Sequence, residues 1–181
     1  DATGVFDVDA IGLTQVCTNL NHGRDIGGAP IDPPTGVYIG VGANPVAVEL
    51  EREIERYFAK IDAGAEFAIT QPVFDPEALV RFLDRVEQYE RTIPVIAGVW
   101  PLLSYRNAEF MNSEVPGVEV PESILMRMEA CKTKESARAE GVAIARDTMG
   151  KIAHRVQGFQ VSAPLGILSI AMKVLEGVDE L

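Results

Sequence analysis

The sequence predicts an α/β fold with a parallel sheet. Four short runs of apolar and β-branched residues lie at positions 37–41, 67–70, 94–99 and 158–162. Each run is almost continuously apolar, which is typical of parallel strands covered on both faces. Amphipathic segments separate the runs, as in right-handed βα units. A (β/α)8 barrel typically needs about 250 residues, so a chain of 181 residues with four strands forms either a small open sheet or part of a barrel.

The helices follow from apolar spacing and from capping residues. Residues 45–63 place Val48, Ile54 and Phe58 among many charged side chains and so predict an amphipathic helix. Asp75 followed by Pro76 is typical of an N-cap with proline in the first helical turn. Further helices are expected at 8–20, 121–130, 135–156 and 166–175, with a loop rich in Asn, Gly, Asp and Pro over 19–35.

Composition and charge exclude several classes of function. The chain has 16 Lys and Arg against 27 Asp and Glu, a formal net charge of −11. Such a surface repels nucleic acid and anionic lipid, so we expect neither as a partner. Cys17 and Cys131 are isolated in sequence, which favours a reducing, cytoplasmic setting. His22 and His154 have no further ligands at metal-binding spacing, so no metal site is expected.

The carboxyl ends of the strands are where a parallel α/β fold binds ligands. Gln71 follows the second strand, and its amide suits the edge of a heterocycle, although capping of a neighbouring loop explains it equally well. Asn44 before Pro45 predicts either a helix start facing a phosphate or an ordinary N-cap. From composition alone, Lys60 is an exposed charge. We find no nucleophile beside a base, no carboxylate pair and no P-loop, so these patterns do not define the chemistry.

A longer motif resembles a known family. The segment AGAEFAITQPVFD at 63–75 resembles methylenetetrahydrofolate reductase, and the segment IAGVWP at 96–101 and the spacing between the two support this. Residues 19–28 and VPGVEVP at 115–121 are most similar to the bacterial form fused to a homocysteine S-methyltransferase domain. The chain also opens on Asp1 rather than Met. The resemblance implies that residues 1–181 are the second half of a (β/α)8 TIM barrel whose N-terminal half is absent.

The resemblance implies an activity and its partners. The family reduces 5,10-methylenetetrahydrofolate to 5-methyltetrahydrofolate with NADH or NADPH, through FAD, by ping-pong hydride transfer in one-carbon and methionine metabolism. A folate substrate and a homo-oligomer are expected. The catalytic groups would lie in the missing half-barrel, so the isolated segment is expected to be inactive. Two alternatives remain, namely a non-catalytic partial-barrel module and another pterin-binding (β/α)8 enzyme.

The resemblance also implies roles for individual residues. Gln71 matches a residue that contacts the folate pterin and, in its turn, the nicotinamide, and Asn107 and Met111 match further substrate contacts. The positions that match flavin contacts are Asp7, Asn44, Ala47, Glu53, Arg56 and Lys60. For Lys60 this replaces the exposed charge expected from composition with a contact to the flavin phosphates.

Overall fold

The structure is a computed structural model, and it describes residues 7–89, 91–176 and 178. In chain order the elements are α1 (Ala10–Asn21), β1 (Gly40–Ala43), α2 (Leu50–Asp62), β2 (Phe67–Pro72), α3 (Pro76–Val86), β3 (Val95–Val99), α4 (Tyr105–Glu114), α5 (Glu122–Glu129), α6 (Lys134–Ile152), the 3-10 helix η1 (Ala153–Arg155), β4 (Gly158–Val161), the 3-10 helix η2 (Pro164–Gly166) and α7 (Leu168–Leu175). The predicted α/β class is confirmed.

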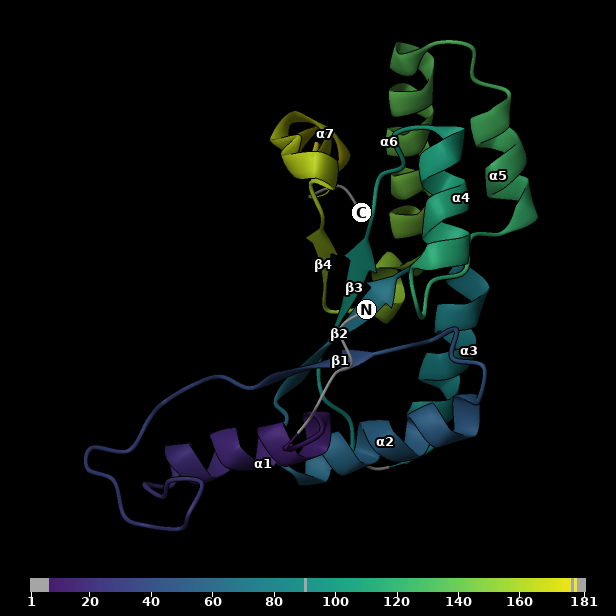
Figure 1. The fold of residues 1–181 in the computed structure, drawn as a ribbon. Helices are drawn as coiled ribbons and strands as arrows, with labels where there is room; N and C mark the ends of the chain where they lie inside the picture. The colour runs from purple at the N-terminus through teal and green to yellow at the C-terminus, as the bar shows by residue number, and fades with distance from the viewer. Residues whose placement is uncertain (1–6, 90, 177, 179–181) are drawn as a thin grey trace.

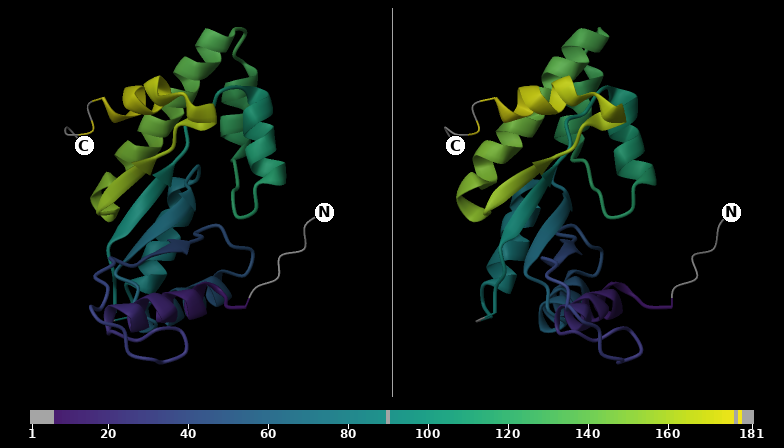
Figure 2. Two further views of the ribbon diagram at one scale, coloured as in Figure 1. Left: turned by 60° about the vertical axis from the view of Figure 1, so that its left-hand side comes forward. Right: turned by 90° about the vertical axis from the view of Figure 1, so that its left-hand side faces the viewer.

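The four strands form one parallel sheet in the order β1-β2-β3-β4. The strands therefore lie in the sheet in the same order as in the chain, which is the arrangement that successive βα units produce. Figure 1 shows the sheet running between α2 and α3 at one end and α4 to α7 at the other, with α1 beside α2. The two turned views in Figure 2 show the same arrangement, with α4, α5 and α6 close together beyond β3.

Helices cover one face of the sheet. Alternate strand residues point toward α2, α3 and α6 and form a cluster that includes Val41, Ala43, Ala68, Val95, Ala97, Tyr57, Leu79, Phe82 and Ile152. The intervening residues Gly40, Gly42 and Gln71 are exposed, and Phe67 and Ile69 are half-buried. The expectation of strands covered on both faces is therefore wrong for the described residues. The strands looked continuously apolar because their less covered face also carries Gly, Phe and Ile.

Helix α4 was not predicted. Its N-cap Ser104 accepts a hydrogen bond from the Asn107 backbone N–H at 3.1 Å, and Ala108 and Met111 point into a second cluster shared with α5 and α6. The sequence does carry a helix signal here: Ser104 can cap the helix at Asn107, and the apolar Ala108 and Met111 follow at helical spacing. The helix is short and largely polar, so its apolar stripe is narrow.

Several element boundaries differ from those expected, and the starts of β1 and α2 are two of them. β1 begins at Gly40 rather than 37, because the backbone N–H and C=O of Val37 bind the Asn21 amide at 2.9 and 2.8 Å and not a neighbouring strand. α2 begins at Leu50 rather than 45. Before it, Asn44 closes an Asx turn, its Oδ1 accepting the Val46 N–H at 3.2 Å. The helix start expected beside Asn44 is therefore not there.

Candidate functional site at the carboxyl ends of the strands

Gln71 lies in a β-bulge near the carboxyl end of β2. Ile69 pairs with Ile96 and Pro72 with Gly98, so β2 uses one more residue than β3 over this stretch. A bulge bends the strand and re-aims its side chains, and bulges are frequent beside active sites. The Gln71 side chain is exposed on the less covered face of the sheet, whereas Thr70 before it is buried.

Thr70 and Gly98 hold this bulge in place. The Thr70 hydroxyl accepts the Gly98 N–H at 2.9 Å and donates to the Gln71 carbonyl at 2.8 Å, so it supplies the hydrogen bond that the irregular ladder omits. A Cβ on Gly98 would lie 2.5 Å from the Thr70 carbonyl oxygen, so only glycine allows this close approach. The conformation of Gln71 is thus set by its two neighbours. Neither neighbour was singled out from the sequence.

Asn44 and Gln71 both border the loop between α4 and α5, whose valines pack into the cluster formed by α4, α5 and α6. A Cβ placed on Gly117, in the loop between α4 and α5, would lie 2.7 Å from Asn44 Nδ2 and 3.5 Å from Gln71 Cγ. Two amide side chains from adjacent strand ends therefore border the same loop residue. The Asn44 backbone N–H also donates to Glu53 on α2 at 3.1 Å, which ties the end of β1 to that helix.

Asn107 and Met111 lie one helical turn apart on α4. The Asn107 Oδ1 accepts the Leu103 N–H at 3.2 Å, which leaves its amide NH2 group as the donor. Met111 is 3% exposed and packs with Ala108 and Val118. The structure therefore places Asn107 at the first turn of α4 and Met111 in the apolar support beneath that turn.

Three of the positions matched to flavin contacts line one cavity. Ala47, Glu53 and Arg56 border a cavity of about 440 Å³ together with Val48, Glu49 and Arg52. Arg56 also pairs with Asp9, the N-cap of α1, at 3.1 Å. The Gly12 N–H and then the Arg56 guanidinium hold the pKa of Asp9 below its usual value. Asp7, two residues earlier, is exposed.

Lys60 is buried and does not line that cavity. It is 6% exposed, and its ammonium donates to the Gly42 carbonyl at 2.8 Å and to Glu53 at 3.4 Å. The exposed charge expected from composition is therefore wrong. Because Glu53 also accepts the Asn44 N–H, the Lys60–Glu53 pair joins the end of β1 to α2 from behind the cavity.

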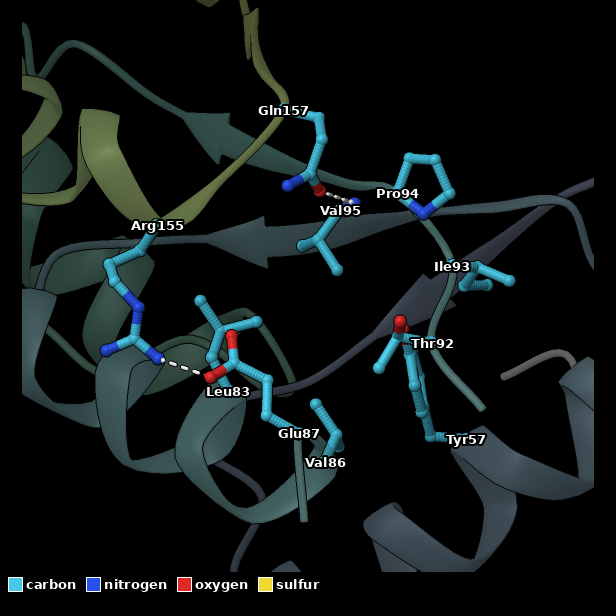
Figure 3. Close-up of a pocket in the computed structure, with 10 residues that line it drawn as sticks. All are labelled: Tyr57, Leu83, Val86, Glu87, Thr92, Ile93, Pro94, Val95, Arg155 and Gln157. Carbon is cyan, nitrogen blue, oxygen red and sulfur yellow. Dashed lines mark hydrogen bonds and ion pairs between the residues drawn. The ribbon is translucent and has the colours of Figure 1, made fainter. Parts of the chain in front are cut away.

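A different cavity, of about 290 Å³, lies at the amino ends of the strands (Figure 3). There Arg155 pairs with Asp84 at 2.7 Å and Glu87 at 3.2 Å, and the Gln157 side chain accepts the Val95 N–H at 2.7 Å. Burial raises the pKa of Tyr57, which also lines it, to about 12. Arg155 and Gln157 are therefore already engaged by other groups of the fold, as expected for the end that supports stability rather than chemistry.

Gln160 is a further candidate that the sequence did not indicate. It pairs with Gly98 in the register of β3 and β4 and is exposed, whereas its neighbours Phe159 and Val161 pack into the core. It therefore shares the face of Gln71, with Gly98 between them. Across the described positions no three His, Cys, Asp or Glu side chains gather as a metal site would require. None of the helices in that part of the chain is long and apolar enough to cross a membrane.

These features define the class of protein: a parallel α/β domain with polar side chains, Asn44 and Gln71 among them, at the carboxyl ends of its strands. The family model for methylenetetrahydrofolate reductase matches residues 38–163. The chain therefore belongs to the methylenetetrahydrofolate reductase family.

Curated relatives carry the same name. The chain is 35% identical over 112 residues to methylenetetrahydrofolate reductase 2 of Schizosaccharomyces pombe, covering 59% of this chain and 17% of that protein. It is 29% identical over 108 residues to a probable NADPH form from Caenorhabditis elegans, covering 56% and 16%. It is 27% identical over 131 residues to a probable NADH form from Oryza sativa, covering 72% and 22%. The chain thus spans about a fifth of the length of these relatives.

A solved structure shares the fold. It is an uncharacterized protein from Clostridium thermocellum that binds two copies of 5-methyl-5,6,7,8-tetrahydrofolic acid. The TM-score is 0.59 at 20% identity, over 83% of this chain and 56% of that one. At this identity the likeness supports the fold, and the ligand is a property of that protein.

Proposed function

We propose that the protein carrying this chain reduces 5,10-methylenetetrahydrofolate to 5-methyltetrahydrofolate by ping-pong hydride transfer through FAD, in one-carbon and methionine metabolism. The family match over residues 38–163, which contains Gln71 and its bulge, is the observation that most supports this. The relatives' names include both NADH and NADPH forms, so either nicotinamide is a candidate donor.

Gln71 would orient the ring being reduced or oxidised. Its side-chain amide offers one acceptor and two donors in fixed directions, which matches a pterin edge and also a nicotinamide carboxamide. The bulge limits the movement of the Gln71 backbone, so the amide is pre-organised for whichever ring is present. The Asn107 NH2 group would provide a second contact, and Met111 would pack beneath it.

The cavity beside α2 suits the phosphate groups of an anionic cofactor, because two arginines border it. Arg52 and Arg56 border the cavity of about 440 Å³, and small Ala47 leaves room between them and the end of β1. Guanidinium groups suit phosphate oxygens. Asn44, Glu53 and Asp7 would lie around the same group, and Lys60 would reach it only with the third proton of its ammonium. When bound, the flavin supplies the hydride relay between nicotinamide and folate.

The remaining expectations belong to the same proposal. Residues 1–181 would be the second half of the barrel, completed by an N-terminal half-barrel, with a fused homocysteine S-methyltransferase domain, a homo-oligomer and a cytoplasmic location. In the described structure β1 and β4 each pair with a strand on one side only, and one sheet face is less covered. Both features support additional strands. Because the missing half would hold the catalytic acid, the isolated segment would be inactive.

The test uses the protein purified at its natural length. We expect a yellow preparation whose flavin absorbance is bleached by NADH or NADPH and restored by methylenetetrahydrofolate. Gln71→Ala should slow the restoring step about tenfold to a hundredfold, since loss of a hydrogen bond to a bound ring is worth roughly 1.5–3 kcal/mol. Gln88→Ala, the same change on an exposed turn beyond α3, is the control.

Other outcomes distinguish the alternatives. A colourless protein that binds no folate would favour the non-catalytic module. Folate binding without bleaching by either nicotinamide would favour another pterin-binding enzyme. Equal rates for Gln71→Ala and Gln88→Ala in single-turnover measurements would remove Gln71 from the mechanism.

A further inference from the structure

Gly117 is the point at which the α4–α5 loop meets the strand ends. Its φ of +78° is in the left-handed region, and the Val118 N–H donates to the Val115 carbonyl at 3.2 Å to close a turn around it. A Cβ at this position would lie 2.7 Å from Asn44 Nδ2, a separation that real Cβ atoms essentially never show, and 3.5 Å from Gln71 Cγ. The backbone conformation therefore favours glycine, and a Cβ at this position would force the Asn44 side-chain amide to shift.

The loop is fixed on its other side. Val118 and Val120 are 7% and 3% exposed and pack into the cluster formed by α4, α5 and α6. The Val120 N–H also donates to Asn112 Oδ1 on α4 at 2.9 Å. With both valines buried, the loop cannot retreat when the contact at Gly117 is made larger. The displacement would fall on the exposed Gln71 side chain and on Asn44.

We infer that Gly117 is a positioning residue that sets the Asn44 and Gln71 amides for recognition of a planar, pterin-like heterocycle. By having no side chain, it lets the loop backbone border both amides and forms one wall of the site. This inference rests on the proposed function, because it concerns the same ring that Gln71 would orient. It adds that the wall is supplied from the α4–α5 loop, outside the strand ends themselves.

The test is an equilibrium titration of the natural-length protein with 5-methyltetrahydrofolate. Gly117→Ala should weaken binding about tenfold, the effect of losing one well-placed hydrogen bond. Gly28→Ala is a matched control, because Gly28 has a φ of +83° but no atom within 4 Å of its Cβ position. Both variants introduce the same left-handed strain, so both should lower the melting temperature, but only Gly117→Ala should weaken folate binding.

Two further variants separate steric contact from backbone strain. Asparagine tolerates left-handed φ values, so Gly117→Asn should keep a near-normal melting temperature and still weaken binding. This variant also decides the question if Gly117→Ala fails to fold. Asn44→Ala removes the atom nearest the new Cβ, so the effects of Gly117→Ala and Asn44→Ala on folate binding should not add. A loss caused only by general instability would add to that of Asn44→Ala.

The outcomes keep the two proposals apart. If Gly117→Ala and Gly117→Asn bind folate as tightly as Gly28→Ala while Gln71→Ala binds weakly, the inference is overturned and the proposed function stands. If the unmodified protein binds no folate, the proposed function fails and the inference fails with it. Weak binding by both Gly117 variants, with tight binding by Gly28→Ala, supports the inference.

Discussion

Thr70→Val tests whether the bulge at Gln71 depends on one hydroxyl. Valine keeps the shape of threonine but removes both hydrogen bonds, the one accepted from Gly98 at 2.9 Å and the one donated to the Gln71 carbonyl at 2.8 Å. Thr70 is 5% exposed, and its bond from the Gly98 N–H is buried, so that N–H would lose its partner out of reach of water. An unsatisfied buried donor costs about 1–3 kcal/mol, and the second bond adds about 1 kcal/mol. We therefore expect a loss of about 2–4 kcal/mol.

The assay is urea unfolding of the natural-length protein, followed by circular dichroism and compared with Thr14→Val. Thr14 is 4% exposed, and its hydroxyl donates to the Ala10 carbonyl within α1, an oxygen that helix geometry already pairs. That control should lose no more than about 1 kcal/mol, since only one hydrogen bond is removed and no buried donor is left without a partner. If the two variants are equally stable, Thr70 does not hold the bulge and the account of Gln71 fails. Thr70→Val should also weaken folate binding, since Gln71 would lose its fixed backbone.

Two further predictions concern charged groups. Lys60→Met leaves the Glu53 carboxylate largely buried without its cation, so the unfolding free energy should fall by about 2–3 kcal/mol. The control is Arg52→Met, which breaks the exposed Arg52–Glu49 pair and should alter the unfolding free energy by less than about 0.5 kcal/mol. Equal effects would mean that the buried pair is not structural. The pKa of Asp9 is lowered in the folded state, first by the Gly12 N–H and then by Arg56. The stability that Asp9 adds is therefore present above its ordinary pKa of 3.8 and is lost as the pH falls through the lower folded value. Asp9→Asn should flatten the pH dependence of the melting temperature below about pH 5, and an unchanged profile would contradict this.

The fold was predictable where local pattern and tertiary packing agree. α2 and α3 carry apolar stripes that pack on the sheet, and three of the strands lie where their apolar runs indicated. α4 was missed because its stability comes from two buried residues, Ala108 and Met111, in an otherwise polar segment. The start of β1 was misplaced because Val37 is bound by Asn21, a contact between distant positions that strand propensity does not contain.

The candidate site was predictable only as a set of positions. The rule that ligands bind at the carboxyl ends of parallel strands made Asn44 and Gln71 candidates without any family information. It could not show that Thr70 and Gly98 shape the bulge, because a bulge is a difference in register between two strands. Nor could it place Gly117 beside the two amides, since that contact joins segments more than forty residues apart.

Lys60 shows how the structure refines a role taken from resemblance. A buried ammonium needs partners, and here they are the Gly42 carbonyl and Glu53, which also accepts the Asn44 N–H. Asn44 is therefore held from behind by the charged pair and bordered in front by Gly117. Loss of Lys60 would therefore free Asn44, the residue that Gly117 also borders. Because Lys60→Met and Gly117→Ala both act through Asn44, their effects on folate binding should not add. The effects of Lys60→Met and Gly28→Ala on folate binding should add, because Gly28 does not contact Asn44.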